Sequence, residues 1–539
     1  MNQPSSDRVV LIHPPAVSKR YLRTKFMPYG MAVIYAFLKE RRIPVVQYDF
    51  LMEYLFDSPD DINFHSVDHS FTQEDFFGYL RGTKDHKGLD AFTKKYGQRL
   101  PRDGCLYGFS IVAYHQFWAS LLLAQYIKKN NPPAIIVFGG PYITIRPAAS
   151  LLAFGQADYW IKGSGELPLL YLYQLIRGEA NISLEEIPGL LYQKTGATHH
   201  APQCRFPAEE ERPPDFEGLP LDRYQYDHPV TGKRTFFIPY RLSKGCPSRC
   251  SFCTGRLVDS YDWKSPAKVV AELAHLSATY RSSNFQFADA SINGNPKQLS
   301  QVCKMLKDSL PQIKWYAYAK VTGFDRELLL QVKEAGCFSL FWGIESASQA
   351  TIDLLGKGFR VEKIYELLDY SISIGLTNFI HIMYNTPHES ITDIEALEAL
   401  ISRYIACPRV VFLPQRFILE PQSLLFERPE KYGLHGLTSV NTSPFEREEY
   451  VYSEVDGNDV EAIRTRNLEH QQMLAPSLEL IRLMEWKRSA KGFLPRLASR
   501  KLLIHLVQRS HDGRRGQRFF GNIFRRLAEG SKQLLSEQL

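Results

Sequence analysis

The chain has 539 residues, of which 44% are hydrophobic and 23% are charged. This composition excludes an intrinsically disordered or fibrous chain, and the length is enough for roughly two to four domains. The 65 Lys and Arg residues exceed the 58 Asp and Glu residues only slightly. A small basic excess is compatible with a nucleic acid, with an anionic substrate or with neither, so its location along the chain matters.

Hydrophobic runs in the sequence are short. The longest, 121–124 and 169–176, fall below the roughly 18 to 20 residues that cross a bilayer. The N-terminus has no signal-peptide pattern, because the apolar stretch 9–12 ends at Pro14-Pro15. We therefore expect no transmembrane segment and a cytoplasmic protein, in which thiols stay reduced.

Strand and helix patterns alternate through residues 1–180. Apolar strands are expected at 8–12, 45–50, 106–112, 134–138 and 159–162, and helices at 30–40, 118–129, 149–154 and 167–177, with an irregular aromatic-rich insertion at 51–102. Buried strands separated by such helices predict an α/β fold with a doubly wound, Rossmann-like parallel sheet. Ligands bind such sheets beyond the carboxyl ends of the strands. The loops expected at that rim hold 28–30, His115, 139–141 and 163–166.

A second alternating series begins after a Pro- and Glu-rich stretch. Residues 181–235 are interpreted as a linker with a small hairpin. At least six strand-helix repeats follow between 236 and 413, which predicts a whole or partial TIM-type (β/α) barrel with its site at the carboxyl ends of the strands. We therefore divide the chain into domains 1–180, 181–235, 236–430 and a helical basic region, 431–539. The stretch 415–422, directly after the last strand, is interpreted as packing and turn rather than as a substrate contact.

Three of the eight cysteines lie within eight residues, in the pattern Cys246-Pro-Ser-Arg-Cys250-Ser-Phe-Cys253. The other five cysteines are scattered along the chain, which argues against a disulfide framework and favours a metal site. Three thiolates leave a 4Fe-4S cluster one ligand short, so that one iron is open to a small molecule. Two alternatives remain: a zinc site completed by a distant residue such as His381, and accidental clustering.

The segment Gly-Cys-Pro-Ser-Arg-Cys-Ser-Phe-Cys resembles the cluster loop of the radical S-adenosylmethionine (SAM) superfamily. The resemblance implies that Cys246, Cys250 and Cys253 hold three irons while SAM chelates the fourth. Reductive cleavage of SAM then gives methionine and a 5'-deoxyadenosyl radical. It also implies that Phe252 packs near the adenine.

Motifs downstream extend this resemblance over nearly the whole barrel. It implies that Asp289 lies near the SAM amino group and that Lys320 neutralises the SAM carboxylate, where relatives often carry Arg. The segment Gly343-Ile-Glu345-Ser346 resembles the superfamily's GxES element, which implies that Glu345 and Ser346 bind the ribose or carboxylate. The segment 385–389 departs from the superfamily pattern, because relatives have Gly at the positions of Asn385 and His388.

A doubly wound domain ahead of such a barrel resembles the cobalamin-binding class of radical SAM enzymes. Four segments carry this second resemblance: 28–31, 107–110, 138–141 and 158–166, the last with Ser164 in place of a usual Glu. The resemblance implies a cobalamin site formed by Tyr29, Gly30, Ser110, His115, Gly139, Gly140, Pro141, Gly163, Gly165 and Glu166. No DxHxxG motif occurs, so the resemblance does not imply the His-on arrangement of many cobalamin enzymes. His115 is the candidate for the lower face of cobalt, with an ordinary polar contact as the alternative.

Three functional hypotheses follow. The first is a cobalamin-dependent radical SAM methyltransferase acting on an unactivated carbon of a small molecule, such as a secondary metabolite, or of a peptide. The second keeps the three cofactors (4Fe-4S cluster, SAM and cobalamin) but catalyses cyclisation or rearrangement. The third is a non-catalytic iron-sulfur or electron-relay protein. The first two imply a low-potential electron donor of the flavodoxin or ferredoxin type. No residue is assigned to proton or hydrogen transfer.

The basic excess belongs to the C-terminal region. Between 486 and 528 there are twelve Lys and Arg residues and one acidic residue, Asp512. The remaining chain is therefore mildly acidic, which argues against a nucleic-acid groove. We expect this region to be a solvated face packed on the barrel, with docking of an acidic partner or an anionic membrane surface as the alternative.

Overall fold

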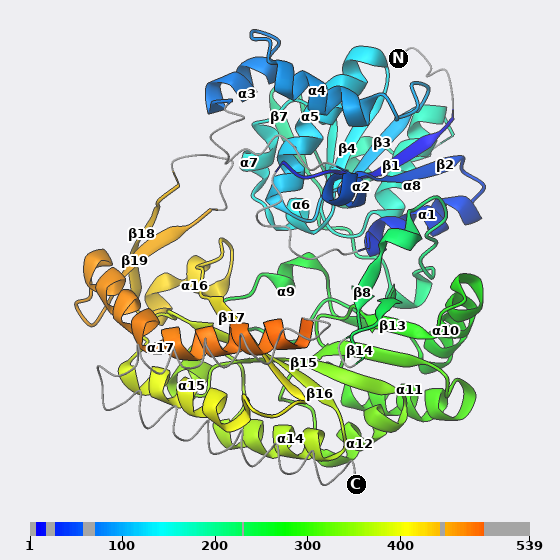
Figure 1. The fold of residues 1–539 in the computed structure, drawn as a ribbon. Coiled ribbons are helices and arrows are strands. Elements are labelled where there is room, and N and C mark those ends of the chain that lie inside the picture. Colours follow the sequence, from blue (N-terminus) through cyan, green and yellow to red (C-terminus); the bar gives the residue numbers. More distant parts are fainter. Residues whose placement is uncertain are drawn as a thin grey trace.

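The computed structural model describes residues 7–17, 27–57, 71–179, 181–228, 231–441 and 448–489. Two α/β units lie one above the other, with β8 of the linker and α9 of the second unit between them (Figure 1). This arrangement confirms the predicted fold class. No helix among the described residues is long and apolar enough to cross a membrane.

The N-terminal unit is a seven-stranded sheet in the order β2-β1-β3-β4-β5-β6-β7. Strands β1 to β5 are parallel and carry helices on both faces, whereas β6 and β7 are antiparallel. Its strands and helices are β1 (Val9–His13), α1 (Tyr29–Glu40), β2 (Val45–Asp49), α2 (Phe50–Asp57), α3 (Gln73–Leu80), α4 (Lys87–Gly97), β3 (Leu106–Ser110), α5 (Tyr114–Asn130), β4 (Ile135–Gly139), α6 (Pro141–Ile145), α7 (Ala148–Leu152), β5 (Tyr159–Ile161), α8 (Glu166–Arg177), β6 (Leu190–Lys194) and β7 (Ala197–His200).

Two expectations for this unit require correction. The described parts of the stretch 51–102, which are 51–57 and 71–102, are mainly helical, because they contain most of α2 together with α3 and α4. Helix α3 begins at a capping box formed by Thr72 and Asp75, and its aromatic residues bury against α5. The hairpin expected in the linker is β6–β7, which extends the N-terminal sheet.

The second unit is an open, all-parallel sheet in the order β10-β13-β14-β15-β16-β17, which makes it a partial barrel. Buried residues of this sheet pack against the flanking helices, in a core cluster that also includes residues of the N-terminal unit and of the connecting segment. Its strands and helices are β10 (Ile238–Tyr240), β11 (Ser243–Lys244), α9 (Gly255–Val258), β12 (Asp262–Trp263), α10 (Pro266–Tyr280), β13 (Asn284–Phe287), α11 (Pro296–Ser309), β14 (Lys314–Ala319), α12 (Arg326–Glu334), β15 (Cys337–Glu345), α13 (Gln349–Leu354), α14 (Val361–Ser373), β16 (Thr377–Tyr384), α15 (Ile391–Tyr404) and β17 (Val410–Arg416).

The connection between the units contains the short hairpin β8 (Gln225–Asp227) and β9 (Arg234–Phe236), together with 3-10 turns. One of these turns, Ala208–Glu210, brings Glu211 to the interface between the two units.

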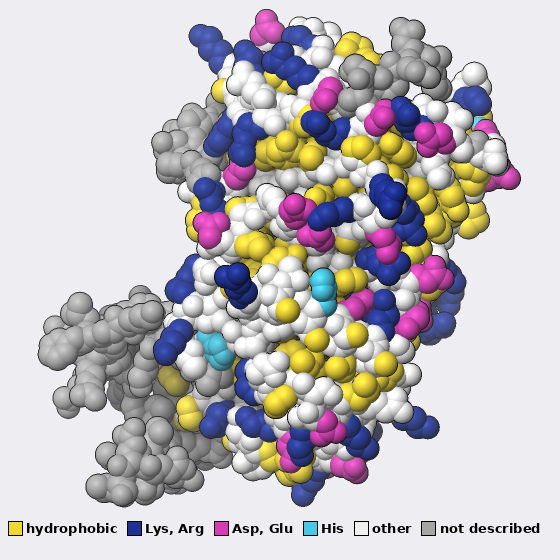
Figure 2. Space-filling view, turned by 90° about the vertical axis from the view of Figure 1, so that its right-hand side faces the viewer, with side chains coloured by type: hydrophobic (Ala, Val, Ile, Leu, Met, Phe, Trp, Pro, Cys, Tyr) yellow, Lys and Arg dark blue, Asp and Glu magenta, His cyan; other side chains and the backbone are white. Residues whose placement is uncertain are grey.

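The C-terminal region is only partly helical. After α16 (Leu424–Glu427) it forms the antiparallel hairpin β18 (Leu434–Ser439) and β19 (Tyr450–Glu454), which corrects the expectation of helices alone. Helix α17 (Val460–Ser489) then packs on α15, β17 and β19. Most of the basic stretch 486–528 lies outside the described residues. On the face shown in Figure 2, acidic and basic side chains lie interspersed.

Candidate cofactor sites at the interface of the two units

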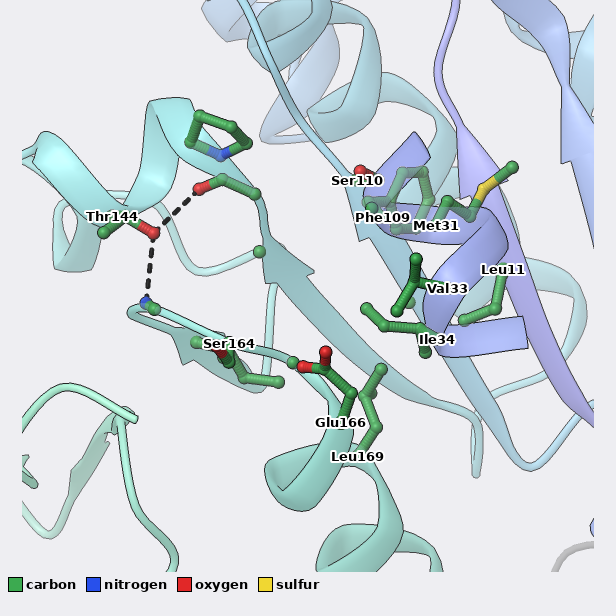
Figure 3. Close-up of a pocket in the computed structure, with 18 of the residues that line it drawn as sticks. Leu11, Met31, Val33, Ile34, Phe109, Ser110, Thr144, Ser164, Glu166 and Leu169 are labelled. Carbon is green, nitrogen blue, oxygen red and sulfur yellow. Dashed lines mark hydrogen bonds between the residues drawn. The ribbon is translucent and has the colours of Figure 1, made fainter. Parts of the chain in front are cut away.

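A cavity opens at the carboxyl ends of the N-terminal strands, with about 860 Å³ of space free of protein atoms. Leu11, Met31, Val33, Ile34, Phe109 and Leu169 give it an apolar wall (Figure 3). Glycines at the ends of β4 and β5 form its rim. A Cβ atom added at Gly30 would have no other atom within 4 Å, so this part of the cavity is open space.

Two short loops of the rim are tied together. The hydroxyl of Thr144 accepts a hydrogen bond from Gly163 N at 3.1 Å and donates to Gly140 O at 3.0 Å (Figure 3). Gly140 and Gly163 have φ values of 100° and 92°, where a side chain would be strained. At Gly140 an added Cβ would also lie 2.4 Å from the carbonyl oxygen of Ile111. These glycines therefore fix the shape of the rim.

Most of the residues that the sequence suggested for cobalamin line this cavity. They are Gly30, Ser110, Gly139, Gly140, Pro141, Gly163, Gly165 and Glu166. Burial raises the pKa of Glu166, which favours its neutral form, while Lys244 opposes the shift.

Tyr29 and His115 lie outside the lining of the cavity. The Tyr29 hydroxyl donates to Glu211 Oε1 at 3.0 Å. His115 is not on a loop, as the sequence suggested, but is buried in the first turn of α5, and its carbonyl accepts a hydrogen bond from Val17 N. Neither Tyr29 nor His115 therefore lies among the glycines that form the rim of the cavity.

The cysteine loop approaches the cavity from the second unit. It follows β11 and is flanked by Arg241, Val258 and Asp259, which line the far side of the N-terminal cavity. Cys246 and Cys250 are partly exposed and Cys253 is exposed. Burial raises the pKa of Cys250, and Lys357 partly offsets this. Gly255 N donates to Cys253 Sγ at 3.3 Å, a contact suited to a thiolate.

Around this loop, the residues suggested for SAM lie at the carboxyl ends of the barrel strands. Lys320 Nζ donates to Ser248 Oγ, within the loop, at 2.6 Å. Glu345 has φ 69° at the irregular end of β15 and pairs with Lys357 at 3.2 Å. Lys357 also lies 5.7 Å from the centre of the Phe252 ring. Lys357 thus connects the acidic residue of the GxES segment with the aromatic residue of the cysteine loop.

Asp289 and Ser346 have more local roles. The carboxylate of Asp289 accepts hydrogen bonds from Leu242 N at 3.0 Å and from Ser243 N at 2.7 Å. It therefore braces the strand that leads into the cysteine loop, and its burial raises its pKa to about 6. Ser346 Oγ accepts a hydrogen bond from Ser348 N at 3.1 Å.

A buried ionic cluster joins the two units, and sequence reasoning missed it. Glu211, which is fully buried, is bonded by Arg241 and lies 3.5 Å from Lys264 Nζ and 3.8 Å from Lys244 Nζ. Burial alone would raise the pKa of Glu211, but Arg241 and Lys264 outweigh it and lower the pKa to about 2. In the sequence, Glu211 sits in an acidic run that resembles an exposed linker.

Lys244 extends this cluster to the rim. Its ammonium group donates to Ser164 Oγ at 2.8 Å and pairs with Asp259 at 3.3 Å. Lys244 thus connects the rim of glycines with the strand that precedes Cys246. A lysine two residues before the first cysteine was the available sequence signal for this contact.

Residues 240–401 match the model of the Radical SAM superfamily. The chain contains a radical SAM domain. An uncharacterized methyltransferase of Pyrococcus horikoshii is 27% identical over 282 residues, which cover 51% of this chain and 59% of the relative. An anaerobic magnesium-protoporphyrin IX monomethyl ester cyclase of Rubrivivax gelatinosus is 26% identical over 245 residues, covering 44% of this chain and 43% of the relative. The matched part thus spans about half the length of these curated relatives.

Solved structures share the fold of both units. The radical SAM methyltransferase TsrM of Kitasatospora setae, with tryptophan substrate and a SAM analogue bound, has a TM-score of 0.62 and 17% identity, and the match covers 88% of this chain and 89% of that one. The cobalamin-dependent enzyme OxsB, with aqua-cobalamin and SAM bound, has a TM-score of 0.64 and 14% identity, covering 100% of this chain and 81% of that one. The radical SAM domain is therefore joined to an N-terminal unit in the same fold as in these enzymes.

Proposed function

We propose that this chain is a cobalamin-dependent radical SAM methyltransferase. One observation carries the proposal: the apolar cavity rimmed by glycines is also lined by Arg241, Val258 and Asp259, which flank the cysteine loop of the second unit. In this proposal residues 1–180, extended by β6–β7, bind cobalamin, 236–430 bind the cluster and SAM, and 431–489 cover the barrel. The names of one curated relative and of the TsrM structure favour methyl transfer.

The residues fit the three groups. Cys246, Cys250 and Cys253 hold the cluster, while Lys320, Glu345 and Phe252 contact SAM, with Asp289 and Ser346 shaping the adjoining backbone. When bound, these groups supply an electron for SAM cleavage and a carrier for the methyl group. The chain's own part is to orient both cofactors and to exclude water through the apolar wall.

The proposal includes partners and location. The substrate is a small molecule or a peptide, and the reductant is a low-potential flavodoxin or ferredoxin. The enzyme acts in the cytoplasm, and the basic C-terminal stretch is the candidate for contact with an acidic partner.

The test is anaerobic reconstitution with iron, sulfide and hydroxocobalamin, followed by SAM and a low-potential reductant. Cobalamin that stays bound through gel filtration, with both S-adenosylhomocysteine and 5'-deoxyadenosine as products, supports methyl transfer. A protein that retains no cobalamin overturns the proposal. A cluster whose EPR signal is unchanged by SAM indicates the electron-relay alternative.

A second candidate is a cobalamin-dependent cyclisation or rearrangement. It is favoured by the magnesium-protoporphyrin ester cyclases among the curated relatives. It predicts 5'-deoxyadenosine without S-adenosylhomocysteine in the same experiment.

A further inference from the structure

A second cavity lies at the carboxyl ends of β16 and β17, apart from the rim of glycines. It holds about 790 Å³ of space free of protein atoms, and its walls come from the segment after β17, the hairpin β18–β19 and helix α17. Sites of parallel (β/α) barrels form at this edge of the sheet. The cavity thus lies on the same edge as Lys320 and Glu345.

The wall of this second cavity is mixed, with apolar and polar side chains in similar share. Phe417, Leu419, Tyr452 and Ile463 are buried, and they belong to one hydrophobic cluster. An apolar ligand gains free energy from removing its surface from water against such a wall. This part of the wall therefore suits the apolar part of a ligand.

Two amide side chains belong to the polar part of the wall. The Oδ1 atoms of Asn385 and Asn467 are buried, and neither has a hydrogen-bond partner among the described residues. Asn385 is only 5% exposed, and its backbone N–H is held by Glu389 Oε2 at 3.0 Å. A buried acceptor without a partner destabilises the fold, because the water that it loses is not replaced. A ligand that donates an O–H or N–H would remove this cost.

The charged side chains at the rim of this second cavity are already paired. Arg416 pairs with Glu449 at 2.9 Å, and Arg464 lies 3.6 Å from Glu461. Because each guanidinium faces a carboxylate, the rim offers no excess positive charge for an anion. The ligand that fits best is therefore uncharged.

We propose that this cavity binds the substrate of the reaction, an uncharged small molecule that has an apolar part and donates an O–H or N–H to Asn385 or Asn467. This inference rests on the proposed function, because it assigns the substrate of that same enzyme. It also revises the interpretation of 415–422 as packing alone, since Arg416 to Leu419 line the cavity. The amino group of the SAM adenine is a second source of an N–H donor, so the test must separate the two.

The test uses ¹⁹F NMR on the reconstituted holoenzyme with two probes of similar size. 4-Fluorophenol carries an O–H donor and 4-fluoroanisole does not. We expect fluorophenol to bind about tenfold more tightly than fluoroanisole, and we expect the double variant Asn385→Leu/Asn467→Leu to abolish this preference, as loss of one buried hydrogen bond predicts. SAM at saturating concentration should leave the fluorophenol signal unchanged.

Two tryptophan substitutions on α17 provide a matched pair. Ile463→Trp fills the cavity and should eliminate probe binding, whereas Leu468→Trp, at a position 57% exposed, should leave it intact. Equal affinity for the two probes, or retained binding in Ile463→Trp, overturns the inference. Displacement of fluorophenol by SAM assigns the amides to the adenine and overturns it as well.

Binding and catalysis are measured separately in this design. If SAM is not cleaved but the probes behave as expected, the proposed function fails while the cavity retains its selectivity. If SAM is cleaved and the probes show no preference, the substrate assignment alone fails.

Discussion

The cysteine loop and the cavity rimmed by glycines face each other across the domain interface, yet they are built from opposite kinds of residue. The loop offers side-chain donors, three thiols within eight residues. The cavity offers space, because its rim is built from glycines, two of which, Gly140 and Gly163, have backbone angles that strain any other residue. A ligand that is bound by side chains requires particular residues at fixed spacing, which is visible as a sequence motif. A ligand that is bound by the shape of a cavity requires mainly small residues, which are less specific in the sequence. The predictions below test this difference.

The largest effect is expected in the loop. Cys250→Ala should remove cluster absorbance near 400 nm and lower SAM cleavage at least about a thousandfold, because one of three protein ligands is lost. Cys407→Ala, outside the motif, is the control and should retain both. Substantial SAM cleavage by the Cys250 variant would contradict the assignment of the loop.

The corresponding change in the cavity is Gly30→Phe. A Cβ atom added at Gly30 would have no other atom within 4 Å, so the phenylalanine ring should occupy the cavity. We expect it to weaken cobalamin retention about a hundredfold. Equilibrium dialysis measures the retention. Gly155→Phe, which also meets nothing within 4 Å but lies away from the cavity, should bind cobalamin normally. Because neither site is crowded, both variants should unfold at the wild-type temperature.

The next largest effect is expected for a substitution at the interface between the two units. Glu211→Gln leaves Arg241, Lys264 and Lys244 without their shared carboxylate, which should lower the free energy of unfolding by about 3 kcal/mol. Urea denaturation measures this loss, with the exposed neighbour Glu210→Gln as control.

This contribution should also depend on pH in a defined direction. The folded pKa of Glu211, about 2, lies below its ordinary value of 4.5. Its stabilisation is therefore complete above pH 4.5 and is lost as the pH falls toward 2. A wild-type stability that is flat across this range, or unchanged between wild type and Glu211→Gln, would contradict the role of Glu211.

The smallest expected effect is on SAM affinity. Lys320→Met removes the ammonium group that contacts Ser248 and should weaken SAM binding about tenfold without loss of the cluster. Iron content and SAM binding are measured on the same samples. Lys304→Met, at an exposed position on α11, should change neither.

Much of the fold could be predicted, because buried parallel strands leave continuous apolar runs. Helices α3 and α4 were missed, although Thr72 and Asp75 form a capping box that is legible in the sequence. The hairpin β18–β19 was missed because β18 is mostly exposed and has no apolar alternation.

The candidate sites were predictable to different degrees. The cysteine motif is local, so its position could be read from spacing. Glu211 and Thr144 could not be assigned, because their partners come from distant segments or from backbone atoms. Tyr29 and Asp289 lie close to the cofactor regions but bind protein groups there, a distinction that depends on side-chain direction.

The position of Glu211 bears on how such enzymes can be recombined. Its carboxylate comes from the connecting segment, while its partners Arg241 and Lys264 come from the barrel and Tyr29 from the N-terminal unit. A chimera that exchanges either unit at residue 180 or 235 without matching this segment would bury several charges without a counterion. The connecting segment therefore cannot be exchanged independently of the barrel, and grafting experiments should transfer the two together.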